Sequence, residues 1–216
     1  MRTRILAVVA GIAVVGCGEK AQDVKNAANA AQAAAAAAPQ IVDNQNEAAK
    51  FQEERRSRGD TVAMGYQELQ KYLPSAPDGY KADEEPSGSS QSMTGFSMSQ
   101  AEQTFSKPAP PDGSAPSVQV TLVDFGGTQS AYGIMALPMM MNLSQEDAHR
   151  RMTTLKMDTP FTWGTEEFDK DNKDSKVTVV TRYRYLITVE ARHHGTDELA
   201  MLKRMAEDVA RKFEGK

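Results

Sequence analysis

Apolar or β-branched residues occupy every second position of one segment near the C-terminus, and this alternation limits the fold more than any other pattern in the chain. The segment covers residues 177–191. Successive side chains of a strand point to opposite faces of a sheet, so the pattern predicts extended chain with one buried face. Strands usually have about 3–10 residues. The segment is therefore either one long bent strand or two strands joined near residues 182–184.

A helix with one apolar stripe is expected directly after this segment. Thr196 is the expected N-cap, and Asp197 and Glu198 suit the positive end of a helix. The stripe needs an apolar surface to cover, and the preceding strands supply one. Strands and helix together predict an α+β fold, an antiparallel sheet with helices packed on one face. The stripe consists of Leu199, Leu202, Met205, Val209 and Phe213.

Shorter patterns predict the other elements of this domain. Residues 118–125 alternate cleanly and predict a strand, which Gly126-Gly127 ends. Residues 66–73 have helical spacing and stop before Pro74. The remaining expectations are a polar loop over 83–92, a strand within 92–106, helices over 128–136 and from 144 to 152, strands over 152–157 and 161–168, and a polar turn over 169–174.

The N-terminus has a basic, then an apolar, then a small-residue pattern. Arg2 and Arg4 precede an apolar run over residues 5–15, and Gly16 and Cys17 follow it. This order is typical of a secretory signal peptide. The run is shorter than the roughly 20 apolar residues that a membrane-spanning helix needs. We therefore expect a signal peptide that is removed.

The end of this segment resembles the lipobox of bacterial lipoproteins. The resemblance is carried by Val14, Val15, Gly16 and Cys17. It implies that residues 1–16 are cleaved off and that Cys17, the only cysteine, carries the lipid. A secreted chain with one thiol forms no internal disulfide, so the odd cysteine needs another use. The alternatives are an uncleaved N-terminal anchor, or an ordinary signal peptide with a chance cysteine.

The resemblance also implies a location in the bacterial cell envelope. Stable anchoring takes more than one acyl chain, and the lipid of this family carries several, palmitate among them. No aspartate follows Cys17, because Gly18 and Glu19 come next. In Gram-negative relatives that pattern implies the outer membrane, with the protein facing the periplasm. Acylation of Cys17 also excludes it as a catalytic nucleophile.

A low-complexity segment follows the cysteine. Residues 19–38 are rich in alanine, the best helix former, and Pro39 ends the run. Residues 44–58 are dense in charge and helical in pattern, with Gly59 as the expected stop. We interpret this region as a partly helical tether between lipid and domain. A disordered linker of no required length and a coiled coil with a partner are the alternatives.

The chain is thus divided into a signal peptide (1–16), a lipidated cysteine with its Ala-rich, charged tether (17–60) and an α+β globular domain (61–216). Loss of the two arginines of the signal peptide changes the formal net charge from −4 to −6. This acidity argues against nucleic acid as a partner, because nucleic acid binds through basic patches.

The order of elements in the domain resembles the Mog1/PsbP-like fold. The resemblance covers about 150 residues and lies in the helix that ends at Leu73-Pro74, the strand over 118–125 with Gly126-Gly127, and the strand over 183–191 that leads into the last helix. It implies a small accessory or partner-binding module, and it carries over no catalytic residues.

Short motifs for catalysis or metal binding are incomplete. Asp124-Phe125-Gly126 matches a protein-kinase tripeptide, but the glycine-rich loop and the H-R-D loop are missing, so we interpret it as the end of a strand. Residues 169–174 are similar to a calcium loop, but Lys173, Asp174 and Val180 stand where its glycine and its ligands belong. We expect a solvated hairpin turn there.

The three histidines do not predict a shared metal site. His193 and His194 are adjacent at a strand end, so their side chains point to opposite faces. Together with His149 they are expected to face solvent or to lie in loops.

Methionine is the one unusual residue type, with twelve copies, three of them consecutive. Thioethers bind Cu(I), so Met139, Met140 and Met141 with His149 are candidate copper ligands. The alternatives are core packing and a partner-binding apolar patch.

The sequence favours a membrane-anchored, non-enzymatic envelope module that uses no cofactor and binds an envelope protein. The alternatives are a metal-handling lipoprotein that uses methionine and histidine, and a hydrolase whose site is assembled from residues distant in sequence.

Overall fold

The computed structural model describes residues 43, 45–109, 111, 114–127, 144–156, 162–194 and 196–214. Backbone contacts divide the chain into Met1–Ala36 and Ala37–Lys216, and every described residue belongs to the second unit. The predicted signal peptide, Cys17 and the Ala-rich run lie outside the described residues, as does the helix expected over 128–136. No helix in the described part is long and apolar enough to cross a membrane.

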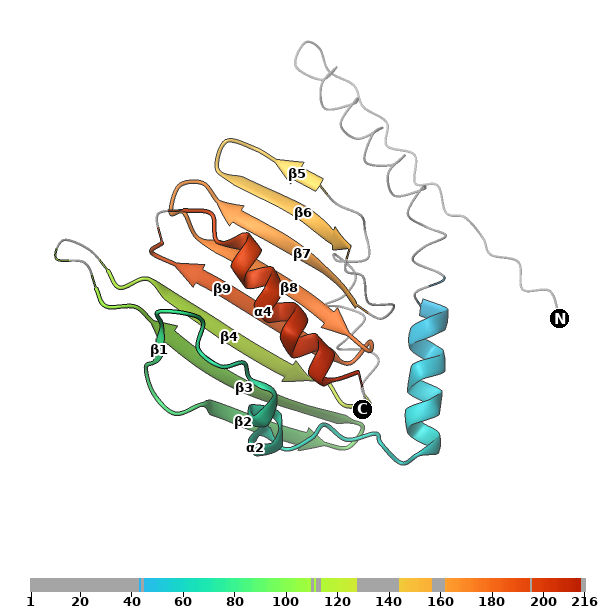
Figure 1. The fold of residues 1–216 in the computed structure, drawn as a ribbon. Coiled ribbons are helices and arrows are strands. Elements are labelled where there is room, and N and C mark those ends of the chain that lie inside the picture. The colour runs from blue at the N-terminus through green and yellow to red at the C-terminus, as the bar shows by residue number, and fades with distance from the viewer. Residues whose placement is uncertain are drawn as a thin grey trace, which may run out of the picture. The chain divides into compact units, whose positions relative to one another are not determined.

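The described residues form one antiparallel sheet of nine strands (Figure 1). Its order is β1-β3-β4-β9-β8-β7-β6-β5, and β2 also pairs with β3, on the same side as β1. The strands are β1 (Lys81–Ala82), β2 (Ser87–Met93), β3 (Phe96–Ser106), β4 (Ser117–Asp124), β5 (Ser144–Glu146), β6 (Arg150–Lys156), β7 (Thr162–Asp169), β8 (Ser175–Thr181) and β9 (Tyr185–Arg192).

The long alternation consists of two strands, which confirms one of the two expectations for it. β8 and β9 pair with Thr181 opposite Tyr185 and Val177 opposite Val189. Odd-numbered residues of both strands therefore share one face. The alternation stops at the turn, where Tyr183 joins the apolar cluster of Val180 and Leu186 on the opposite face. Arg182 and Tyr183 in that turn have positive φ angles of 53°, which non-glycine residues seldom adopt.

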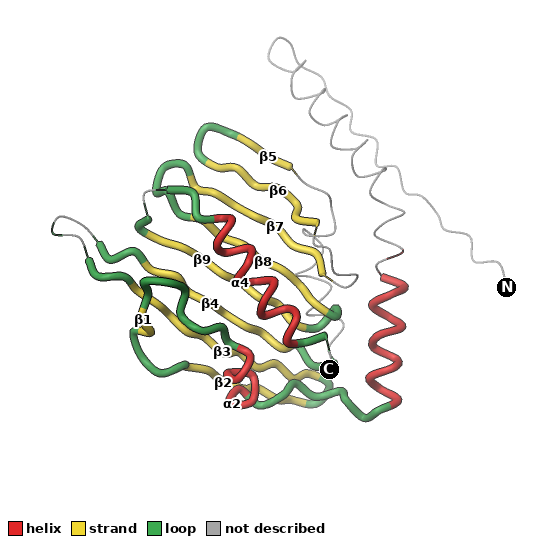
Figure 2. Tube along the Cα trace, viewed as in Figure 1, coloured by secondary structure: helices red, strands yellow, loops and turns green. Residues whose placement is uncertain are grey.

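Three described helical segments cover one face of the sheet (Figure 2). They are α2 (Tyr66–Leu69), the 3₁₀ turn η1 (Gln70–Tyr72) and α4 (Leu199–Lys212). The predicted stripe of α4 is buried, and its C-cap Phe213 stacks on Tyr185 with ring centroids 4.1 Å apart. Tyr72 stacks on the same phenylalanine at 4.5 Å, so all three segments share one core. These segments confirm the α+β class.

A further helix packs against the opposite face. Residues 45–57 are helical, and Ala48 and Phe51 contact an apolar cluster of Phe125, Val180, Tyr183 and Leu186. The helix expected over 44–58 is thus present, and Gly59 with φ 73° follows it. The helices α2, η1 and α4 pack on one face, as expected, whereas the helix over 45–57, which we interpreted as part of the tether, packs on the opposite face because the sheet has apolar surface on both sides at this end.

The start of α4 and the segment after residue 143 differ from the sequence prediction. The N-cap of α4 is Glu198, not Thr196, whose hydroxyl donates to Glu198 Oε1 at 2.9 Å, while the Asp197 carboxylate accepts from Leu199 N at 3.0 Å. The expected helix from residue 144 is instead the β5–β6 hairpin. Asp147 accepts hydrogen bonds from the backbone N–H groups of His149 and Arg150. An aspartate can close a turn in the same way that it caps a helix.

The strands expected over 152–157 and 161–168 correspond to β6 and β7, and the strand within 92–106 to β3. The predicted polar loop over 83–92 contains β2, whose seven residues are all exposed. With no apolar side chain before Met93, β2 shows no alternation in the sequence.

Candidate functional site

A buried ion pair lies at the end of the sheet where β4 finishes. Arg184 is the last residue of the β8–β9 turn, and its side chain is 4% exposed. Its Nε and Nη2 donate to the two carboxylate oxygens of Asp124 at 2.6 and 2.9 Å. Asp124 is fully buried and accepts two further bonds, from the backbone N–H groups of Met64 and Gly126. All four donors are needed because a buried carboxylate without partners is costly.

The same guanidinium holds the segment before α2. Its Nη1 donates to both oxygens of Asp60 at 2.8 Å, and its Nη2 donates to the carbonyl of Val62 at 3.0 Å. Burial alone would lower the pKa of Arg184, but the bonds and charge of Asp124 outweigh it and raise this pKa. Arg184 is therefore a permanent cation that joins residues 60–64 to the sheet.

A second arginine reaches the site from the helix over residues 45–57. Arg55 is 7% exposed, and its Nη2 donates to the carbonyl of Gly126 at 2.6 Å. Its Nε is buried and has no hydrogen-bond partner among the described residues. Burial and the charge of Arg184 lower the pKa of Arg55. The site therefore contains a buried cation whose hydrogen bonding is incomplete.

Gly126 and Gly127 let these segments approach one another. Gly126 has φ 56°, and a Cβ there would lie 2.6 Å from the backbone nitrogen of Ala63. Gly127 donates its N–H to the carbonyl of Thr61 at 2.8 Å, and its own carbonyl accepts from Gln52 Nε2 at 2.9 Å. The glycines that end β4 are thus required by close packing.

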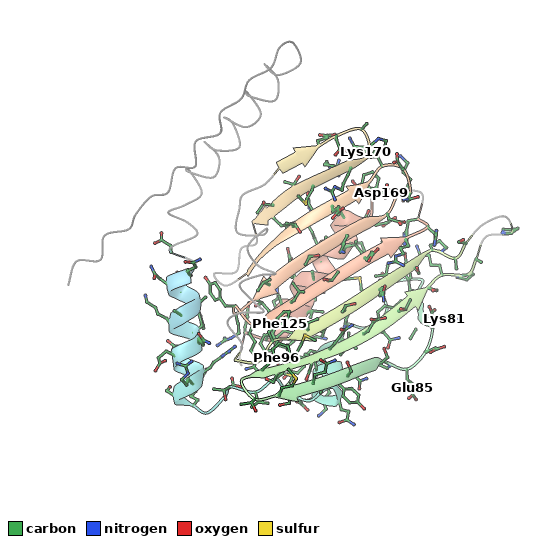
Figure 3. The ribbon with its side chains drawn as sticks, turned by 180° about the vertical axis from the view of Figure 1, so that it is seen from behind. Lys81, Glu85, Phe96, Phe125, Asp169 and Lys170 are labelled. Carbon is green, nitrogen blue, oxygen red and sulfur yellow. The ribbon has the colours of Figure 1, made fainter. Side chains whose placement is uncertain are left out.

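An open cleft of about 280 Å³ borders this network, and we name it the arginine cleft. Phe96 and Phe125 mark this end of the sheet (Figure 3). Val62 and Met93, 59% and 71% exposed, line the cleft and are the exposed large hydrophobic residues of the described part. The lining is Gln52, Arg55, Arg56, Asp60, Thr61, Val62, Ser92, Met93, Gly95, Phe96, Ser97 and Gly127.

The chemistry of the arginine cleft suits an anionic group beside an apolar one. Arg55 and Arg56 supply guanidinium groups, while Asp60 is already paired with Arg184. A guanidinium presents a planar set of donors that fits a carboxylate or phosphate. Pockets that bind ligands are mostly apolar, with a few polar groups that fix orientation.

A second, more open hollow of about 670 Å³ lies between α4 and the segment after η1. Two of its lining residues are in contact, with the Lys107 Nζ 4.6 Å from the ring centroid of Tyr80. Burial and the Glu198 carboxylate raise the pKa of Tyr80. The lysine and arginine side chains that line this hollow are balanced by a similar number of aspartate and glutamate side chains, so the hollow has no dominant charge.

The predicted histidines lie apart from the arginine cleft. His149 is exposed and pairs with Asp171 at 2.8 Å. The side chain of His194 is only 4% exposed, lies 3.4 Å from Glu198 and stacks on Tyr80. We expected solvent-facing or loop histidines, and His194 is a loop residue that packs inward. His193 has φ 62° and is exposed.

The remaining candidates from the sequence are the methionine triplet, the lipobox residues and two short motifs. Met139, Met140 and Met141 lie outside the described residues, as do Val14, Val15, Gly16 and Cys17. In the described ranges, histidine, cysteine, aspartate and glutamate form no group of three that could hold a metal. Residues 169–174 form the predicted hairpin turn, in which Asp169 accepts bonds from Asp171 N and Asn172 N. Asp124 is the last residue of β4, which agrees with the interpretation of Asp124-Phe125-Gly126 as the end of a strand.

The arginine network is not predicted from the sequence, although one signal for it exists. Asp124 continues the buried positions of Val118, Val120 and Leu122 along β4. A carboxylate in phase with a buried face needs a buried partner, but nothing in the sequence says which cation supplies it.

The chain matches no protein-family model. A search among curated proteins likewise finds no match. The resemblances to lipoproteins and to the Mog1/PsbP-like fold therefore stay predictions.

Proposed function

We propose that the protein is a lipid-anchored, non-enzymatic binding module of the bacterial cell envelope, and that it binds an envelope protein in the arginine cleft. The N-terminal pattern that ends at Cys17 supports the anchor. Arg55 carries the binding proposal, because it is a nearly buried cation whose Nε has no hydrogen-bond partner among the described residues, and it lies beside two exposed apolar side chains.

The fitting partner is an extended peptide segment with a carboxylate next to an apolar side chain. The carboxylate pairs with the guanidinium groups of Arg55 and Arg56. The apolar side chain packs between Val62 and Met93, which removes apolar surface from water. The chain as a whole is mildly acidic, so an anionic group of a partner is attracted to the local cluster of arginines and not to the rest of the surface.

The binding proposal is tested with a photo-crosslinking amino acid at position 62 of the full chain in cells. We expect one abundant envelope protein to be captured there. The matched position is Asn172, which is exposed in the β7–β8 turn at the other end of the sheet. The adduct should weaken with Arg56→Glu, a substitution at an exposed side chain. The same captured proteins at both positions, or no adduct, would contradict the proposal.

The anchor is tested separately. Cys17→Ser should leave an unprocessed precursor without lipid, while Ser92→Cys, added far from the cleavage site, should not restore lipidation. A Cys17→Ser chain that is processed and acylated normally would refute the lipobox interpretation.

A further inference from the structure

The outer edge of β2 has no strand partner among the described residues, while α2 packs over one face of β2, where Tyr66 N donates to Ser90 Oγ at 2.9 Å. β2 pairs only with β3 among the described strands, and all seven of its residues are exposed. Proteins commonly protect such edges with charges, proline, bulges or very short strands. The sequence of β2, Ser-Gly-Ser-Ser-Gln-Ser-Met, has no charge and no proline. Its register with β3 runs without a bulge from Ser87 opposite Glu102 to Met93 opposite Phe96.

The backbone groups that face outward on this edge can be assigned. Asp83 N donates to the carbonyl of Thr104, so even-numbered residues of β3 direct their backbone groups toward β1 and β2. Their partners in β2 are the odd-numbered residues 87–93. In an antiparallel pair, hydrogen-bonded and non-bonded positions alternate. The N–H and C=O groups of Gly88, Ser90 and Ser92 therefore point away from the sheet.

We propose that β2 pairs with β2 of a second copy of this chain, antiparallel and about a twofold axis at Ser90. Ser90 then lies opposite its own copy, and Gly88 lies opposite Ser92 of the other chain. The three pairs exchange about six backbone hydrogen bonds. The two sheets become one continuous sheet, and the same faces stay on the same sides. The pairing shares Ser92 and Met93 with the lining of the arginine cleft, but its hydrogen bonds come from the backbone of β2 and not from the side chains of the cleft.

The residues of β2 fit a second copy better than a charged peptide. Ser89 lies opposite Gln91 of the other chain, and Met93, which is 71% exposed, lies opposite the small Ser87. No like charges meet, because β2 has none. Glu85 lies at the opposite end of β2 from Phe96 (Figure 3), so in the antiparallel register it faces Gly95 of the other chain and not Glu85. A parallel register would place the acidic ends together.

One strand pair buries less surface than the roughly 1,600 Å² of a standard protein interface. We therefore expect a weak dimer, whose occupancy rises when both copies are confined to one membrane.

The test uses a charge exchange at the paired positions Ser89 and Gln91. Both side chains are exposed and neither lines the arginine cleft. One variant is Ser89→Lys/Gln91→Lys, and the other is Ser89→Glu/Gln91→Glu. Full-length chains with two different affinity tags are coexpressed, and the fraction of the second tag that copurifies with the first is measured.

We expect copies without substitutions to copurify. Two copies of the lysine variant, or two of the glutamate variant, should copurify at least about tenfold less, because each pairing opposes like charges directly. A lysine copy with a glutamate copy should restore copurification. The matched control, Ser57→Lys/Ser114→Lys, adds the same charge at exposed serines elsewhere and should change nothing. All variants should melt within about 2 °C of the original chain.

The proposal is overturned if the unsubstituted copies do not copurify, if the lysine variant pairs with itself as well as the original does, or if the mixed pair is not restored. An unaltered self-association of the lysine variant would mean that copies meet through another surface.

Discussion

Asp124→Asn is expected to destabilise the domain strongly, although it changes one oxygen to a nitrogen. The two carboxylate oxygens of Asp124 accept four hydrogen bonds, two from Arg184 and one each from Met64 N and Gly126 N. An asparagine amide leaves two of these donors facing an NH₂ group. Among the described residues, Arg184, which is 4% exposed, then keeps Asp60 as its one counterion.

The size of the effect follows from burial. Removal of one partner of a buried ion pair costs about 3–5 kcal/mol, and we expect the lower end, about 3 kcal/mol, because Asp60 remains. For a domain of this size that corresponds to a fall in Tm of about 6–12 °C. Urea unfolding at pH 7 measures it, in a Cys17→Ser background that carries no lipid, with the fluorescence of Trp163 as the signal.

Two further variants test whether the buried pair controls this stability. Asp60→Asn should cost only about 1 kcal/mol, because the Asp60 side chain is 40% exposed and water screens its charge. The double variant Asp124→Asn/Arg184→Gln should lose at least about 1 kcal/mol less than the sum of its single variants. Equal costs for Asp60→Asn and Asp124→Asn, or additive single effects, would show that the buried pair does not control the stability of this end.

Three further predictions concern the same end of the sheet. Burial raises the pKa of Tyr185 to about 12; the charge of Arg184 opposes this shift and that of Asp124 adds to it. Above pH 10 the tyrosine therefore loses its proton in the unfolded chain before it does so in the folded one. The free energy of unfolding falls as a result until about pH 12. Tyr185→Phe should reduce the stability loss between pH 9 and 11 by about 1.4 kcal/mol in urea unfolding, and an unchanged loss would contradict the assignment. Gly126→Ala should cost about 3 kcal/mol, because it adds a steric clash to backbone strain, whereas Gly59→Ala, with positive φ but open space around it, should cost about 1 kcal/mol. A chain that begins at Thr61 loses Asp60, Arg55 and the packing of Phe51 on Tyr183. It should therefore unfold at a clearly lower urea concentration than the full chain. Equal unfolding midpoints would show that the helix over residues 45–57 adds no stability.

Elements with a strong side-chain pattern could be predicted from the sequence, and those without one could not. β4, β8, β9 and α4 each bury one face, which imposes a period of two or of 3.6 on their residues. β2 buries no face, so its serines carry no periodicity. At Asp147 the sequence pattern is shared by a helix start and a tight turn, and only the pairing of β6 with β5 decides between them.

The candidate site was harder to predict because its parts come from distant positions. Arg184 is separated by 60 residues from Asp124 and by 124 from Asp60. Sequence patterns reveal the periodicity within one element. This ion pair instead requires that β9 pairs with β4 and that residues 60–64 cross the end of the sheet.

The contacts that stabilise this end also determine the form of the arginine cleft. Arg184 fixes Asp60 and the carbonyl of Val62, and these residues form one wall of the cleft. Arg55 also lines the cleft; it donates to the carbonyl of Gly126, and its Nε has no hydrogen-bond partner in the described part of the chain. Asp60→Asn should therefore weaken partner binding by more than its small effect on stability implies, because it loosens the wall that carries Val62. A loss of the adduct at position 62 in an Asp60→Asn chain that still melts near the original temperature would separate the positioning role of Asp60 from a general effect on folding.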